Sequence, residues 1–69
     1  MIKPGTLVQI IKSKDQPPWL KTFWGQYGVV VQRTYMETYG NYGFYKVLMG
    51  TGKIEIFHYF DLAIIKIKH

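Results

Sequence analysis

The sequence predicts an all-β fold, a single domain over residues 1–69 built as a five-stranded barrel. Three observations support this fold class. Five short runs rich in β-branched and aromatic residues are separated by turns that contain glycine or proline. No segment places its apolar residues with the period of a helix. The chain is long enough for one small core, and 2 Trp, 6 Tyr and 4 Phe residues are available to fill it.

The first strand and a long first loop are expected within residues 2–26. The Pro4-Gly5 turn precedes a β-branched run, which predicts a strand over Thr6–Lys12 with Val8 and Ile10 on its inner face. Residues 13–26 then form the loop, which is polar at its start and stiffened by two consecutive prolines. Four large apolar residues follow the prolines: Trp19, Leu20, Phe23 and Trp24. They predict either a lid over one end of the barrel or a hydrophobic anchor for a partner.

The other four strands are expected over residues 28–35, 44–49, 53–57 and 63–68. Gly28 is expected to take a backbone angle that other residues avoid, so that the chain turns sharply into the second strand. Alternation in the fourth strand predicts Ile54 and Ile56 on the inner face, with Lys53 and Glu55 outside. The last strand is expected to place Ile65 and Ile67 on one face and Lys66 and Lys68 on the other.

The connections between these strands predict a particular barrel. Gly50-Thr51-Gly52 is a tight hairpin turn, and residues 58–62 break the period of two, which favours one 3₁₀ turn before the last strand. The order of strand, long loop, strand, loop, strand, tight turn, strand, 3₁₀ turn and strand is that of a five-stranded SH3-like barrel. The alternative is an OB-like barrel, which usually has a helix between the third and fourth strands, where this chain has only the three-residue turn.

Two stretches resemble known SH3-like proteins. The segment 5–10, GTLVQI, followed by 25–30, GQYGVV, resembles the opening of KOW-type domains, with a glycine directly before a valine-rich strand. The segment from Val47 to Leu62, with its glycine turn and an aromatic turn that ends in Asp-Leu, resembles small uncharacterised SH3-like proteins of tailed phages. The resemblance implies a binding module and a viral origin.

Composition narrows the class of protein further. The chain has no cysteine, which excludes disulfides and thiolate zinc sites. No apolar run reaches the roughly 20 residues that a membrane span needs, and the N-terminus lacks the pattern of a signal peptide, so a soluble, intracellular protein is expected. The net charge of +5 favours an anionic partner such as nucleic acid, although a charge of this size is also common among small soluble domains.

The residues that could perform chemistry are few. Ser13, His58 and Asp61 could form a nucleophilic site only if the serine hydroxyl reached the histidine. The simpler interpretation is that Asp61 stabilises the 3₁₀ turn and that His58 lies on the surface. A metal site would have to use His58, Asp61 and the terminal His69, and no glycine-rich phosphate loop precedes a helix. We therefore expect no enzymatic activity, no metal and no cofactor.

Basic and aromatic residues predict one binding surface. The first loop and the tip between the second and third strands usually lie close together in such a barrel, and aromatics interleaved with cations suit single-stranded nucleic acid. Tyr39 and Tyr42 are not needed to form the tip, which makes them candidate binding residues. The full candidate set for nucleic-acid or partner binding is Lys12, Lys14, Lys21, Arg33, Lys46, Lys53, Trp19, Trp24, Tyr39 and Tyr42.

Two functional hypotheses follow. In the first, the protein is a non-enzymatic, phage-encoded accessory protein that contacts nucleic acid, or the transcription or replication machinery, through the basic and aromatic surface. In the second, it is a structural or protein-interaction component, such as a capsid, neck or tail protein or a host-factor binder, that uses the loop from Trp19 to Trp24 as its anchor. The second hypothesis allows a homo-oligomer or a larger assembly. The expected location is the host cytoplasm or the virion, with no membrane partner.

Overall fold

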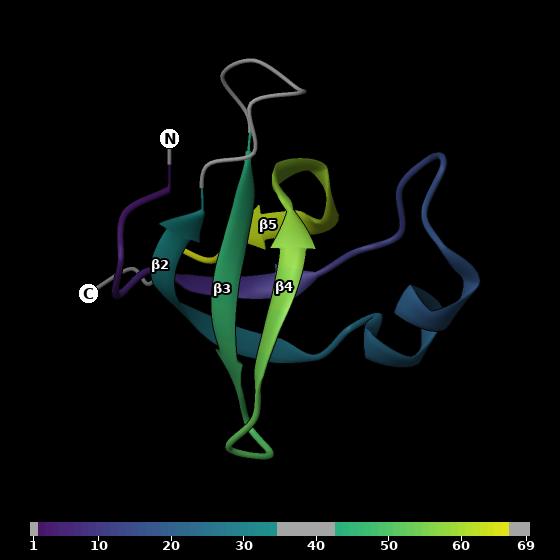
Figure 1. Ribbon diagram of the computed structural model, residues 1–69. Coiled ribbons are helices and arrows are strands. Elements are labelled where there is room, and N and C mark those ends of the chain that lie inside the picture. The colour runs from purple at the N-terminus through teal and green to yellow at the C-terminus, as the bar shows by residue number, and fades with distance from the viewer. Residues whose placement is uncertain (1, 35–42, 67–69) are drawn as a thin grey trace.

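The computed structural model describes residues 2–34 and 43–66 of the chain (Figure 1). Its strands are β1 (Leu7–Ile10), β2 (Tyr27–Thr34), β3 (Phe44–Met49), β4 (Ile54–His58) and β5 (Leu62–Ile64). They form one antiparallel sheet in the order β4-β3-β2-β1-β5, so that β4 and β5 are its two edges. The predicted all-β fold class is thereby confirmed, and β3 has the predicted bounds.

The sheet folds into two layers because β2 bends. In Figure 1, β3 and β4 run steeply across β1 and the first part of β2. The register between β2 and β3 shifts between Val30 and Gln32, which leaves Val31 as the extra residue of a bulge. A bulge increases local twist and lets one strand take part in two layers. Val30 is fully buried before the bulge, whereas Val31 is exposed.

The core lies between the two layers. Its buried apolar side chains come from every strand, from the first loop and from the N-terminal end of the described chain: Ile2, Val8, Ile10, Leu20, Val30, Tyr45, Val47, Met49, Phe57 and Leu62. Val8 and Ile10 occupy the inner face, as predicted. Tyr45 is fully buried, and its hydroxyl accepts a hydrogen bond from the Ile2 backbone N–H (3.3 Å), so this polar atom is not left unsatisfied in the core.

The prediction for the inner face of β4 is wrong. Ile54 and Ile56 are 55% and 50% exposed, and the buried residue of this strand is Phe57 at 1%. Phe57 lies opposite Tyr45 in the register with β3, and the two aromatic rings fill the core side. Because side chains alternate along a strand, burial of Phe57 sends both isoleucines to the outer face and places Glu55, half-buried, on the core side.

The last strand is also shorter than predicted. β5 ends at Ile64, where the described pairing with β1 ends with Val8 opposite Ile64. The Ile65 N–H still donates to the Leu7 carbonyl (3.0 Å), but the chain before Leu7 pairs with Val30 instead. Ile67 and Lys68 lie outside the described residues.

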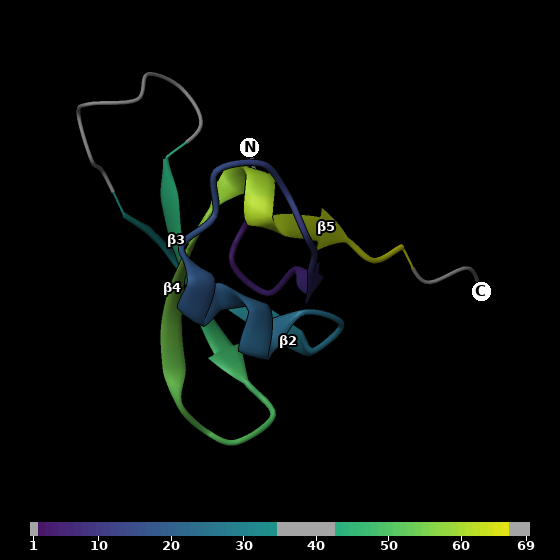
Figure 2. The same ribbon diagram turned by 90° about the vertical axis from the view of Figure 1, so that its right-hand side faces the viewer.

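The first loop contains a helix that the sequence analysis does not predict. η1 (Pro18–Phe23) is a 3₁₀ helix with Pro18 in its first turn, a position where the missing N–H of proline costs nothing. The helix ends at Phe23, and the N–H of the following residue, Trp24, donates to the Lys21 carbonyl (3.2 Å). Figure 2 shows η1 packed over the face of the sheet near β3 and β4. The predicted 3₁₀ turn before the last strand is confirmed as η3 (Tyr59–Asp61).

The prediction that Gly28 needs an unusual backbone angle is wrong. The positive φ in this region belongs to Gly25 (83°), not to Gly28. A Cβ on Gly28 would lie 2.5 Å from Val47 Cγ1 and 2.9 Å from the Leu48 carbonyl oxygen, closer than real contacts allow. Glycine is therefore required at this position because β3 approaches β2 closely.

Candidate functional site

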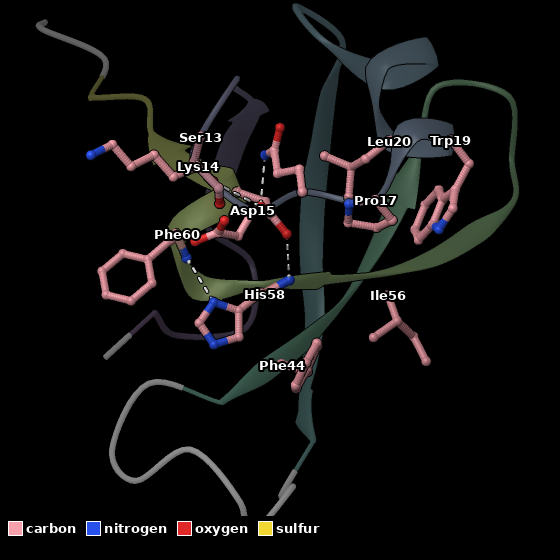
Figure 3. Close-up of a pocket in the computed structure, with 12 residues that line it drawn as sticks. Ser13, Lys14, Asp15, Pro17, Trp19, Leu20, Phe44, Ile56, His58 and Phe60 are labelled. Carbon is pink, nitrogen blue, oxygen red and sulfur yellow. Dashed lines mark hydrogen bonds between the residues drawn. The ribbon is translucent and has the colours of Figure 1, made fainter.

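A groove of about 430 Å³ lies between the first loop on one side and β4 and η3 on the other (Figure 3). Its lining combines an apolar surface with a few polar groups: Ser13, Lys14, Asp15, Gln16, Pro17, Trp19, Leu20, Phe44, Ile56, His58, Phe60 and Asp61. Figure 3 shows Phe60 at one end of this groove and Trp19 at the other, with His58 between them. A concave, largely apolar site with a small number of placed polar groups is typical of binding sites.

The polar wall of the groove is built around Asp61. This carboxylate is only 7% exposed and accepts three hydrogen bonds. Oδ1 accepts from Gln16 Nε2 (2.7 Å) and from Ser13 Oγ (3.3 Å), and Oδ2 accepts from the His58 backbone N–H (3.0 Å). The last of these bonds is half of a capping box, whose other half is the Asp61 backbone N–H donating to the His58 side chain. His58 Nδ1 also accepts from the Phe60 N–H (3.3 Å). The hydrogen bonds of Asp61 therefore connect the first loop to η3.

The same geometry argues for a structural role of Ser13 and His58. The described hydrogen bonds of Ser13 Oγ go to Asp61 and to the Lys14 carbonyl (3.4 Å), whereas a nucleophilic serine donates to its histidine base. His58 Nδ1 already accepts the Phe60 N–H. Within residues 2–34 and 43–66, no three His, Cys, Asp or Glu side chains gather closely enough to hold a metal ion, and His69 lies outside those residues.

A row of rings forms the apolar floor of the groove. The His58 ring lies edge-on to Phe44, with centroids 5.0 Å apart, and 5.3 Å from the ring of Phe60 on its other side. Phe44 and His58 are paired across β3 and β4, which places them on the same face of the sheet. We call Phe44, His58 and Phe60 the aromatic row.

The loop from Trp19 to Trp24 serves in part as a lid and in part as a surface. Leu20 is buried in the core, and Phe23 and Trp24 pack against it. Phe23 contacts Phe57 edge-to-face at 5.5 Å. Trp19 is different, because it rests on Phe23 at 6.2 Å but is 53% exposed and lines the groove. The four large apolar residues of this loop therefore differ, since three of them cover the core and Trp19 is exposed.

The ring of Trp24 contacts two of the predicted basic residues. Lys12 Nζ and Lys21 Nζ lie 5.6 and 5.9 Å from its ring, within the range of cation–π contacts. The indole Nε1 donates to Gln16 Oε1 (3.0 Å), and Gln16 Nε2 donates to Asp61 and to the Ile11 carbonyl (2.8 Å). Gln16 therefore links Trp24 to the groove wall.

The remaining candidate residues that the structure describes do not converge on one surface. Lys14 lines the groove at the end where Phe60 lies, away from Trp19 (Figure 3). Lys46 lies opposite Ile56 in the register, which puts it on the outer face of the sheet, whereas Arg33 lies opposite the buried Tyr45 and therefore belongs to the other face. Lys53 is exposed at the β3–β4 hairpin. Tyr39 and Tyr42 lie outside the described residues.

An apolar stripe continues the groove along the outer face. Leu48 and Ile54 are paired across β3 and β4, and Ile56 follows Ile54 two residues along the strand. All three are exposed, and Ile56 also lines the groove. We call Leu48, Ile54 and Ile56 the apolar stripe. Exposed apolar patches of this kind mark interaction sites more often than single exposed residues do.

Sequence reasoning misses Gln16 and the outward isoleucines. Gln16 gives no signal of its own, since its link to Asp61 joins segments 45 residues apart and its other two side-chain bonds, to Ile11 and Trp24, follow no recognisable local motif. Ile54 and Ile56 follow the pattern of an inner face, and only the larger apolar volume of the neighbouring Phe57 could have indicated the opposite phase. The interpretation that no segment has the period of a helix is wrong for η1, because Leu20, Phe23 and Trp24 have the i, i+3, i+4 spacing of a helical face after two prolines.

Comparisons with known proteins identify no relative of this chain. No protein-family model matches the chain, and neither a curated protein nor a solved structure does. Among the described residues, no helix is long and apolar enough to cross a membrane. The resemblance to KOW-type domains and to tailed-phage proteins stays a prediction from sequence motifs.

Proposed function

We propose that this protein is a non-enzymatic binding module that recognises a segment of a partner protein through the groove and the adjoining apolar stripe. One observation carries the proposal. Within residues 2–34 and 43–66, eight large apolar residues are exposed, and five of them lie in or beside this one site: Trp19, Leu48, Ile54, Ile56 and Phe60. Burying such side chains against a partner is favourable by about 25 cal/mol per Å² of apolar surface. Tryptophan is among the residues that most often dominate binding energy at protein interfaces.

The nature of the exposed residues favours a protein over nucleic acid as the partner. Leu48, Ile54 and Ile56 have no aromatic face on which a base could stack, and stacking supplies much of the affinity for single strands. The predicted basic residues are also divided between the two faces of the sheet, as Lys46 and Arg33 illustrate. An aliphatic and aromatic site suits apolar side chains of a protein segment.

Substitution of Trp19 tests the proposal. Partners would be captured from cells with the wild-type protein, with Trp19→Ala and with the matched control Tyr27→Ala. Tyr27 is 54% exposed, almost the same as Trp19, but does not line the groove. We expect Trp19→Ala to lose a captured protein that Tyr27→Ala retains. Equal capture by both variants would contradict the proposed site.

Single-stranded nucleic acid is the second candidate, because a cation and two aromatic rings line the same groove: Lys14 and Phe60 at one end and Trp19 at the other. Titration with oligothymidylate across a salt series tests it. Four phosphate contacts would give a log–log slope of roughly −3, and Trp19→Ala should weaken the binding. Absence of binding at low salt would reject this candidate and leave the protein-binding proposal standing.

A further inference from the structure

β4 is an edge strand, and part of its backbone is directed away from the sheet. The Met49 N–H donates to the Lys53 carbonyl (2.9 Å), which makes these two residues a hydrogen-bonded pair at the start of the hairpin. Bonded and non-bonded pairs alternate along an antiparallel ladder. Ile54 and Ile56 therefore fall in non-bonded pairs with β3, and their N–H and C=O groups are directed to the free edge.

The free edge has a defined extent. At its far end the His58 N–H is already used, because it donates to Asp61 Oδ2 (3.0 Å). The open part thus comprises the backbone groups of Ile54 and Ile56, whose side chains belong to the apolar stripe. The groove lies at the closed end, where Ile56, His58 and Asp61 are all part of its lining. Backbone groups, exposed apolar side chains and a groove adjoin one another here.

We propose that β4 binds an acidic, extended segment of a partner protein as an additional strand of the sheet. The backbone of the segment hydrogen-bonds to Ile54 and Ile56, and its apolar side chains cover the stripe and enter the groove. Main-chain bonds then supply affinity and the alternate side chains supply specificity, as in other cases of strand addition. This inference rests on the proposed function, since it names how the same site would hold its partner.

The charge around the edge indicates an acidic partner. Lys53 precedes β4, and Lys46 lies directly opposite Ile56 on the outer face. Glu55 is the one acidic residue within β4, and the carboxylate of Asp61 is occupied by its three internal hydrogen bonds. The whole chain carries +5. An acidic segment would therefore be attracted both at the edge and at longer range.

A second copy of this chain fits the edge poorly. Antiparallel pairing of two β4 strands through their free groups would place Ile54 opposite Ile56 of the other copy, and Glu55 opposite Glu55. Like charges directly opposite one another destabilise a strand pair. The two copies would also bring together two chains of net charge +5. The other sheet edge, β5, spans only Leu62–Ile64 and offers a shorter template.

A backbone-methylated peptide tests strand addition without altering the protein. The probe is a capped peptide of alternating aspartate and valine, about seven residues long, which is sufficient to cover a strand of this size. One version carries N-methyl groups on the valine amides and another on the aspartate amides. Only one set of amides can face β4, so we expect one version to bind about tenfold more weakly and the other to bind like the unmodified peptide. Equal binding by the two versions, or no binding by the unmodified peptide at about 1 mM, would overturn the proposal.

Two protein variants separate this inference from the proposed function. Ile54→Pro removes an N–H that faces away from β3, so the ladder with β3 is kept, and proline is tolerated at such edge positions. Ile54→Ala removes the same side chain but keeps the N–H, which makes it the matched control. We expect Ile54→Pro to weaken binding of the peptide about tenfold more than Ile54→Ala does. If Trp19→Ala abolished binding while Ile54→Pro matched Ile54→Ala, strand addition would be rejected and the groove would remain the binding site.

Charge and oligomeric state complete the test. A peptide with lysine in place of aspartate should bind about tenfold more weakly than the acidic peptide, and equal affinity would overturn the acidic assignment. Slower hydrogen exchange at the Ile54 and Ile56 amides on binding would support strand addition directly. A stable dimer in about 0.15 M salt that Ile54→Pro dissociates would overturn the choice of partner in favour of a second copy.

Discussion

Asp61 shows how one side chain can hold a binding groove together. It is buried, and it accepts hydrogen bonds from Gln16, from Ser13 and from the His58 backbone. The first two donors belong to the first loop and the third belongs to the end of β4. A carboxylate is suited to this position because all of its contacts are with donors.

Replacement of Asp61 by asparagine should therefore lower stability. The amide NH₂ of Asp61→Asn would face at least one donor, and a buried polar group without a partner costs about 1–3 kcal/mol. Chemical denaturation should give a loss of unfolding free energy of this size. Asp15→Asn is the control, since Asp15 is exposed and has a positive φ of 62° that asparagine also adopts. A loss equal to that of the control would show that the Asp61 network contributes little to stability.

At this scale the sequence indicates the stabilising role of Asp61 but not its partners. An acidic residue three positions after His58 is the pattern of a capped turn, and the capping box confirms that interpretation. The bonds to Ser13 and Gln16 span 48 and 45 residues of sequence. No local pattern encodes such contacts, because they depend on where the first loop folds back.

Among the elements, η1 has one side chain buried in the core and another exposed at the groove. Leu20 is buried and contributes to the core, whereas Trp19, its neighbour in sequence, is half exposed and lines the groove. Substitutions at these two positions should consequently separate folding from binding.

We expect Leu20→Ala to destabilise the protein by about 2–5 kcal/mol, the usual cost of truncating a buried leucine. Trp19→Ala should cost less, about 1–2 kcal/mol, because Trp19 is half exposed and loses one edge-to-face contact with Phe23. Thermal and urea unfolding of both variants would measure the difference. If the two variants were equally destabilised, Trp19 would belong to the core rather than to the binding surface.

The elements also show where sequence patterns stop being informative. The bounds of β3 are predicted correctly because a glycine flanks the strand on each side, Gly43 before it and Gly50 after it. The position of β4 is predicted correctly, but its buried face is not. Alternation gives the period of a strand, but it does not tell which of the two faces is buried. The inward face is decided by the pairing of Phe57 with Tyr45, which only the register reveals.

For the whole molecule, the positive charge and the apolar stripe have opposite effects on self-association. A net charge of +5 repels other copies, while exposed Leu48, Ile54 and Ile56 favour contact between them. At physiological ionic strength, charges separated by less than about 8 Å are still incompletely screened. The sequence predicts both the charge and the possibility of an oligomer, but the position of the apolar surface follows only from the outward phase of β4.

Raising the salt concentration should therefore reveal the apolar surface. We expect a monomer in dilute buffer and reversible association in about 1 M ammonium sulfate, where charges are screened within about 3 Å and apolar burial is strengthened. Ile56→Lys should abolish this association, because it interrupts the stripe with a charge. Ile64→Lys makes the same replacement of an exposed isoleucine on β5, and we expect it to leave the association largely intact. Light scattering across the salt series would measure both variants. If Ile64→Lys prevented association and Ile56→Lys did not, the copies would associate through the β5 edge. The outer face of β4 would then be rejected as the binding site.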